Sequence, residues 1–171
     1  MITHAQLLEL IKYDPDTGLF TVLKATRRLV EGTVLNRNYF WNGRRQPVRN
    51  TAVYVQQHGN FRAGKLAWFY MTGEWPEIDI DHRDNDGWNQ RWENLRLATR
   101  SQNQANTRRY ESNSSGLKCV FPSGGKKRPW RSQIQKDGQR ISLGRFETKQ
   151  EAFAAYVEAA KSVHGEYARF F

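Results

Sequence analysis

The chain has 171 residues, with 27 lysines and arginines against 17 aspartates and glutamates, which gives a formal net charge of +10. This length suffices for one ordinary domain or two small ones, and the basic surplus favours a polyanionic partner, nucleic acid ahead of a membrane surface. No apolar run approaches membrane-spanning length, acidic residues interrupt the first twenty positions, and the single cysteine, Cys119, excludes an internal disulfide or a cysteine-based zinc site. The composition therefore predicts a protein without a secretory signal or membrane anchor, in a reducing cytoplasm.

Residues 1–60 are predicted to be an accessory region of short elements. Thr3 can cap a short helix whose leucines and isoleucine fall on one side. Residues 13–18 read YDPDTG, which is a turn, and they lead into a strand at residues 19–23.

A basic segment follows at residues 24–49 and is broken by glycines. Its unevenly spaced arginines fit contacts to a DNA backbone and fit solvated loop arginines equally well. Two paired strands are then expected at residues 52–56 and 60–65, followed by an apolar helix at residues 66–71.

The most informative stretch reads IDIDHRDNDGWNQRWENLRLATRSQNQAN. Its alternating start, residues 78–81, is typical of a strand in which the two isoleucines face one side and the two aspartates the other. A polar loop rich in Asp, Asn and Gly leads to a second short strand at residues 95–97. Thr99 followed by Gln102 forms a capping box, so a helix is expected to begin at Arg100. The unit is strand, loop, strand, helix.

This stretch resembles the core of the HNH endonucleases, the ββα-metal finger. That family has an Asp-His pair, then an Asn, then a His or Asn; here Asn94 follows His82 by twelve residues and Asn103 follows by nine more, the family's spacing. The resemblance implies His82 as general base and Asp81 with Asn103 as ligands of one divalent metal, Mg²⁺ first and Mn²⁺ second. It also implies that Asn94 hydrogen-bonds across the loop and orients the His ring. Taken singly, the same residues fit an acidic surface hairpin followed by a capped helix.

The sequence around the Asp81-His82 pair supports the resemblance, with TGEWP before the pair and NQRWENLR and ATRSQNQAN after it. One position departs from the family. Relatives commonly carry His-Arg before a Leu-Ala-Trp segment, whereas this chain has Gly64-Lys65. That His is not among the core site residues, so the predicted activity stands without it.

Residues 109–115 have the composition of a linker, and residues 116–171 are predicted to form a second module. Its expected strands are residues 117–121, 130–135 and 140–143. A helix capped by Thr148 and ending at Gly165 would cover one face of this antiparallel sheet. Residues 107–149 hold eleven basic and three acidic residues, so a charge of +8 is concentrated here.

The module contains the segments SGLKCV, PWRSQI, GQRISLGRF and ETKQEAFAAYVEAAKSVHGEYA. In these segments it resembles the APETALA-type DNA-binding domain of plant ethylene-response factors. Alternation turns Trp130, Ser132, Ile134, Ile141 and Leu143 towards the helix. In that family the opposite face enters the major groove, which implies these DNA contacts: Lys118, Arg131, Gln133, Gln135, Arg140 and Ser142. Two positions depart from the family, because Cys119 replaces a usual Gly and Ser142 stands where plant members often carry Trp. A solvated polar sheet face is the alternative.

Together these patterns predict an α+β protein with an accessory region at residues 1–60, a ββα-metal nuclease core at 61–108, a linker at 109–115 and a sheet-and-helix module at 116–171. The predicted function is a metal-dependent, homing-type endonuclease that cuts double-stranded DNA. We expect a monomer or weak dimer without a membrane or protein partner, in the host-cell cytoplasm if the chain is phage-encoded. Two rivals remain: a non-catalytic DNA-binding regulator that keeps the finger as a scaffold, and a structure-selective nuclease. The target sequence, and whether one or both strands are cut, are left open.

Overall fold

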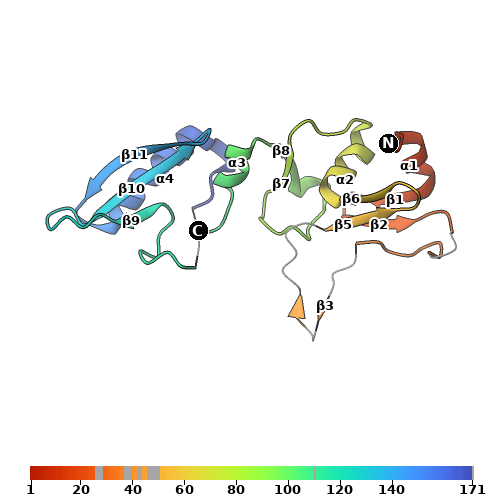
Figure 1. Ribbon diagram of the computed structural model, residues 1–171, viewed down its shortest axis with the longest axis horizontal. Coiled ribbons are helices and arrows are strands. Elements are labelled where there is room, and N and C mark those ends of the chain that lie inside the picture. The colour runs from red at the N-terminus through yellow and green to blue at the C-terminus, as the bar shows by residue number, and fades with distance from the viewer. Residues whose placement is uncertain (26–28, 37–39, 42–43, 46–50, 110, 171) are drawn as a thin grey trace. The chain divides into compact units, whose positions relative to one another are not determined.

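The computed structural model describes the chain apart from residues 26–28, 37–39, 42–43, 46–50, 110 and 171. The described residues form two compact units, Met1–Leu97 and Ala98–Phe171. Helices and small antiparallel sheets occur in both units (Figure 1), which confirms the α+β class. In the described ranges, none of the helices is long and apolar enough to cross a membrane.

The first unit is built from paired strands and two helices around one apolar core. Its elements are α1 (His4–Leu10), β1 (Ile11–Asp14), β2 (Leu19–Val22), β3 (Phe40–Trp41), β4 (Arg44–Arg45), β5 (Ala52–Val55), β6 (Gly59–Arg62), α2 (Ala63–Thr72), β7 (Asp79–His82), the 3₁₀ turn η1 (Trp92–Asn94) and β8 (Leu95–Ala98). Consecutive strands pair, β1 with β2, β3 with β4, β5 with β6 and β7 with β8. Leu7, Phe20, Val53 and Leu66 are fully buried, so α1, α2 and two of the hairpins share this core.

Local sequence signals set the helix limits. The Thr3 hydroxyl accepts a hydrogen bond from the Gln6 N–H, and the Gln6 side chain accepts one from the Thr3 N–H, so α1 begins at the predicted cap. The second helix, α2, begins at Ala63 rather than at Leu66, and β6 is correspondingly shorter than the predicted strand. It ends at Gly73, which has a φ of 77°.

The turn at residues 14–18 packs on the loop that precedes β8. Gly18 has a φ of 73°, and a Cβ atom there would lie 2.4 Å from the carbonyl carbon of Gln90, so a larger residue does not fit. The Tyr13 hydroxyl donates to the Gln90 carbonyl at 2.6 Å. The N–H of Trp92 donates to a carbonyl of the turn at 2.9 Å. The predicted accessory region is therefore part of the same packed unit as the β7–β8 hairpin.

The basic segment at residues 24–49 is described in part. Four of its arginines lie outside the described residues: Arg27, Arg28, Arg37 and Arg49. The buried Asn36 side chain holds the described part against β2, since it accepts a hydrogen bond from the Phe20 N–H at 2.8 Å. A DNA-backbone role for this segment stays a prediction.

The second unit contains a three-stranded antiparallel sheet packed on one long helix (Figure 1), as predicted. Its elements are α3 (Arg100–Ala105), β9 (Val120–Pro122), β10 (Trp130–Lys136), β11 (Gln139–Phe146), α4 (Lys149–His164) and the 3₁₀ turn η2 (Gly165–Tyr167). The strand order is β11-β10-β9. Tyr156 and Ala160 of α4 are buried together with Ile134 of β10. Thr148 caps α4, which ends at Gly165, so both predicted limits are confirmed.

A β-bulge changes which side chains of β11 share a face. Gln133 pairs with Ser142, whereas its neighbour Ser132 pairs with Gly144, so one residue of β11 has no opposite partner in this register. Gly144 has a φ of 119°, which suits the bulge. Ile141 is opposite Ile134 and so shares the predicted helix-facing side, but it lies on the edge strand beside the turn and is 42% exposed.

Candidate active site

The β7–β8 hairpin carries three of the four residues predicted to form the nuclease site. Asp81 and His82 are the last two residues of β7, and Asn94 ends η1 directly before β8. The N–H of Arg83 donates to the Asn94 carbonyl at 2.9 Å, so the intervening loop is closed at its base. Asp81 is buried, at 4% exposure, and His82 is half-buried. Successive residues of a strand face opposite sides, so the two side chains diverge from this end of β7.

Asn94 fastens the loop between the two strands. Its amide nitrogen donates to Asp84 Oδ1 at 3.0 Å and to the Asn89 carbonyl at 2.8 Å. Its amide oxygen accepts from the Asp84 N–H at 3.1 Å. Asp84 also accepts from the Asn89 side chain at 2.7 Å and from the Asp86 N–H at 2.8 Å. The buried Asn94 amide thus fixes the backbone that follows His82.

Asp84 places a negative charge in this loop. Partial burial acts to raise the pKa of the Asp84 carboxyl, but the hydrogen bonds from Asp86, Asn89 and Asn94, together with the nearby His82, hold this pKa below its ordinary value. The carboxylate is therefore ionised at neutral pH.

Asp81 is paired with Arg96 of β8 in the interior of the first unit. Arg96 Nε lies 2.9 Å from Asp81 Oδ2, and the two side chains are 7% and 4% exposed. The guanidinium compensates the buried carboxylate charge and fixes its orientation. The sequence does not indicate this role of Arg96, because the pairing joins residues on two different strands.

Asn103, the other predicted metal ligand, lies on α3 in the second unit. The helix begins at the predicted Thr99–Gln102 capping box. Asn103 is its fourth residue, and its side chain is half-buried. Among the described residues, no three His, Cys, Asp or Glu side chains are grouped as a metal site. The carboxylate and amide oxygens of Asp81 and Asn103 are of the type that Mg²⁺ and Mn²⁺ prefer, so the donor chemistry fits such a metal.

Gly64, where the resembled family commonly carries His, packs closely against β7 and the loop. A Cβ atom at this position would lie 3.1 Å from Ile80 Cγ2 and 3.4 Å from Gln90 Oε1. A histidine would therefore require Ile80 to shift. The adjacent Lys65 forms a surface ion pair with Asp79 at 3.8 Å.

The outward face of the C-terminal sheet gathers most of the predicted DNA-contacting residues. Gln133 is opposite Ser142, and Gln135 is opposite Arg140, so the members of each pair share a face. Arg131, Gln135, Arg140 and Ser142 are exposed and Gln133 is half-buried. Their role in DNA binding stays a prediction.

The register adds one residue to this face and separates two others. Arg131 is opposite Arg145, which an alternation without a bulge would place on the other side; Gly144 within the strand was the available signal for the bulge that turns it outward. Alternation on adjacent strands predicts that Arg131 and Arg140 are near neighbours, and this prediction is wrong. Gln135, the partner of Arg140, is four residues from Arg131 along β10, or about 13 Å.

Lys118 is the one predicted DNA contact that the structure contradicts. Its side chain is buried, and Nζ donates to the carbonyls of Ala105 at 2.6 Å, Thr107 at 2.7 Å and Arg169 at 2.9 Å. The predicted strand starts only at Val120, because residues 118 and 119 form a turn in which Cys119 has a φ of 60°. Positive φ explains why the resembled family has Gly at this position.

Comparison with known proteins identifies a nuclease family whose match includes the β7–β8 hairpin. Residues 63–105 match the family model described as HNH endonuclease. Over 92 residues, 53% of this chain and 74% of its relative, the sequence is 35% identical to Protein 3.8 of Escherichia phage T7. The chain belongs to the family of phage T7 Protein 3.8 and carries an HNH endonuclease domain. No solved structure matches it significantly.

The HNH domain extends from the first residue of α2 to the last residue of α3. It includes all four predicted site residues and also Arg96. Because the match ends at Ala105, the resemblance of the C-terminal module to APETALA-type domains stays a prediction.

Proposed function

We propose that this protein is a metal-dependent endonuclease that hydrolyses phosphodiester bonds of double-stranded DNA. The observation that carries the proposal is the HNH domain, in which Asn94 locks the loop that begins at His82. A scaffold that binds DNA without cutting it would not need this imidazole next to an ionised carboxylate.

In this mechanism His82 is the general base. Its imidazole takes the proton from the attacking water. Asn94 holds the backbone on both sides of the loop, which keeps the ring in one orientation for successive turnovers.

Asp81 and Asn103 are the residues proposed to hold the divalent metal, Mg²⁺ or Mn²⁺, which would neutralise charge on the phosphate and on the departing 3′ oxygen. Arg96 keeps the Asp81 carboxylate oriented, because its Nε lies 2.9 Å from Asp81 Oδ2. The metal-ligand roles of Asp81 and Asn103 follow from the family resemblance and from the oxygen donors that these two side chains offer.

Site selection is proposed for the C-terminal sheet, which would make the protein a homing-type nuclease. Its outward face presents arginine and glutamine side chains, which suit guanine and adenine in the major groove. The excess of eleven basic over three acidic residues at positions 107–149 supports binding to the phosphate backbone.

Supercoiled plasmid tests the proposal. The purified protein should convert it to nicked or linear DNA with Mg²⁺ or Mn²⁺, and excess chelator should stop the reaction. Plasmid that is bound but not cut under both conditions would favour the alternative, a non-catalytic DNA-binding regulator.

A further inference from the structure

Helix α3 carries Asn103, yet it belongs to the second unit. The HNH match covers residues 63–105, and the boundary between the two units lies inside this range, after Leu97. Within the second unit α3 contacts β10, α4 and η2, and Ala105 is the buried residue of this helix. A helix of six residues is not stable by itself in water, so its contacts with the second unit set where α3 lies.

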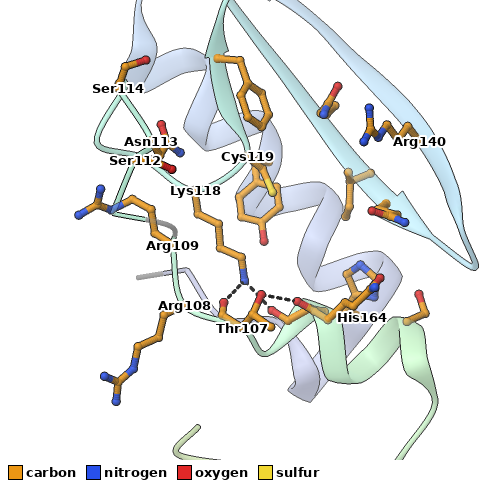
Figure 2. A pocket seen from close by; sticks show the side chains of 18 residues that line it. Thr107, Arg108, Arg109, Ser112, Asn113, Ser114, Lys118, Cys119, Arg140 and His164 are labelled. Atoms are coloured by element: carbon orange, nitrogen blue, oxygen red, sulfur yellow. Dashed lines mark hydrogen bonds between the residues drawn. The ribbon is translucent and has the colours of Figure 1, made fainter. Parts of the chain in front are cut away.

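Hydrogen bonds from two basic residues hold the carboxyl end of α3. The ammonium group of Lys118 donates to the carbonyls of Ala105 at 2.6 Å and Thr107 at 2.7 Å (Figure 2). The Arg169 N–H donates to the Ala105 carbonyl at 3.3 Å, and Arg169 Nε donates to Asn106 Oδ1 at 3.3 Å. The last carbonyls of a helix lack partners within it, and a cation at that end stabilises the helix dipole. Lys118 therefore both satisfies and stabilises this end of α3.

The other connections of α3 also lead into the C-terminal module. The third hydrogen bond of Lys118 Nζ goes to the Arg169 carbonyl at 2.9 Å, which ties the helix end to the last residues of the chain. At the opposite end of α3, Ser101 Oγ accepts a hydrogen bond at 3.0 Å from the Asp137 N–H, in the turn between β10 and β11. Asn103 lies between these two attachments, so the module holds the helix on both sides of it.

We propose that Lys118 is a positioning residue for Asn103: by fastening the end of α3 to the C-terminal module, it fixes the place from which Asn103 binds the divalent metal. The module then has two tasks, because it holds a metal ligand as well as contacting DNA. The proposal rests on the proposed function, in which Asn103 is a metal ligand. Lys118 acts only through α3, since its three N–H groups are used by backbone carbonyls.

Binding of Mn²⁺ to the full chain, followed by the electron paramagnetic resonance signal of the free ion, measures this role without cleavage. Asn103→Ala gives the loss of affinity expected when the ligand is absent. Lys118→Met should weaken Mn²⁺ binding by about tenfold, the effect usual for a residue that holds a metal ligand in place. The Lys118→Met/Asn103→Ala double variant should bind no more weakly than Asn103→Ala, because both changes act through one ligand. Losses that add in the double variant would overturn the proposal.

Three further variants separate positioning from a general loss of stability or charge. Ala152→Gly lowers the helix propensity of α4 but leaves every hydrogen bond to α3 in place, and Lys126→Met removes a positive charge from an exposed side chain. Both should bind Mn²⁺ as the wild type does. Arg169→Ala removes the Nε hydrogen bond to Asn106 and keeps the backbone groups, so it should weaken Mn²⁺ binding by about twofold to fivefold. A loss in Ala152→Gly as large as that in Lys118→Met, or full binding in both Lys118→Met and Arg169→Ala, would overturn the proposal.

Failure of this proposal is distinguishable from failure of the proposed function. Weaker Mn²⁺ binding in Asn103→Ala but not in Lys118→Met would keep the metal role of Asn103 and refute positioning by Lys118. If the wild-type protein binds Mn²⁺ no more tightly than Asn103→Ala, the metal role of Asn103 is refuted and positioning by Lys118 with it. Plasmid cleavage is measured separately, so a wild-type protein that shows the predicted Mn²⁺ affinities but never cuts would refute the nuclease activity alone.

Discussion

Lys118→Met is expected to destabilise the second unit without a specific effect on DNA binding. Methionine keeps the length and apolar stem of the side chain but removes the three N–H groups that reach Ala105, Thr107 and Arg169. Each buried carbonyl that loses its partner costs about 1 kcal/mol or more, so the gross loss is about 3 kcal/mol. Burial of the ammonium group, which lowers the pKa of Lys118 to about 8, opposes this because methionine carries no charge to desolvate. The expected net loss is about 2 kcal/mol.

Hydrogen exchange followed by mass spectrometry measures this loss locally, in peptides from β10 and α4. Lys126→Met is the matched control, because it removes the same charge from an exposed side chain and should change stability by less than about 0.5 kcal/mol. DNA affinity should fall by the same small factor in both variants, as expected for one unit of charge. Unchanged exchange in Lys118→Met together with a selective loss of DNA binding would refute the buried arrangement and restore Lys118 as a DNA contact.

Three further predictions concern other parts of the molecule. Asn94→Ala should destabilise the loop between β7 and β8 by about 2–3 kcal/mol, since three hydrogen bonds are lost; exchange in peptides covering residues 83–94 checks it, and unchanged protection there would contradict it. Burial lowers the pKa of His164 below its ordinary value of 6.5, so the His164 imidazole is protonated less readily in the folded second unit than in the unfolded chain. The stability of the second unit should therefore be fully present above pH 6.5 and should fall as the pH drops below 6.5. Urea unfolding of the second unit as a function of pH should show this fall, and His164→Gln should flatten it. Arg145→Ala should weaken binding to all DNA sequences and reduce the salt dependence by about one unit if Arg145 contacts phosphate; an unchanged slope would place it outside the interface.

The parts of the fold that depend on local chemistry were predictable from the sequence. The caps at Thr3, Thr99 and Thr148 each involve residues three positions apart, so a short pattern is enough to locate the helix start. The spacing of Asp81, His82, Asn94 and Asn103 located the HNH domain, because one family pattern fixes all four.

The parts that depend on distant partners were not predictable in this way. Arg96 pairs with Asp81 across two strands, and no local periodicity indicates such a pair. Lys118 reads as one more exposed base in a basic region, yet the positive φ at Cys119 turns the chain and directs the ammonium group inward. A single bulge at Gly144 was enough to bring Arg145 to the outward face.

The role of His82 as general base can be measured by the single-turnover cleavage rate of His82→Ala. Loss of the imidazole should lower this rate by about a hundredfold to ten-thousandfold with DNA affinity unchanged, whereas His58→Ala, in the turn between β5 and β6, should cut at the wild-type rate. Cleavage by His82→Ala at the wild-type rate would exclude His82 as the general base.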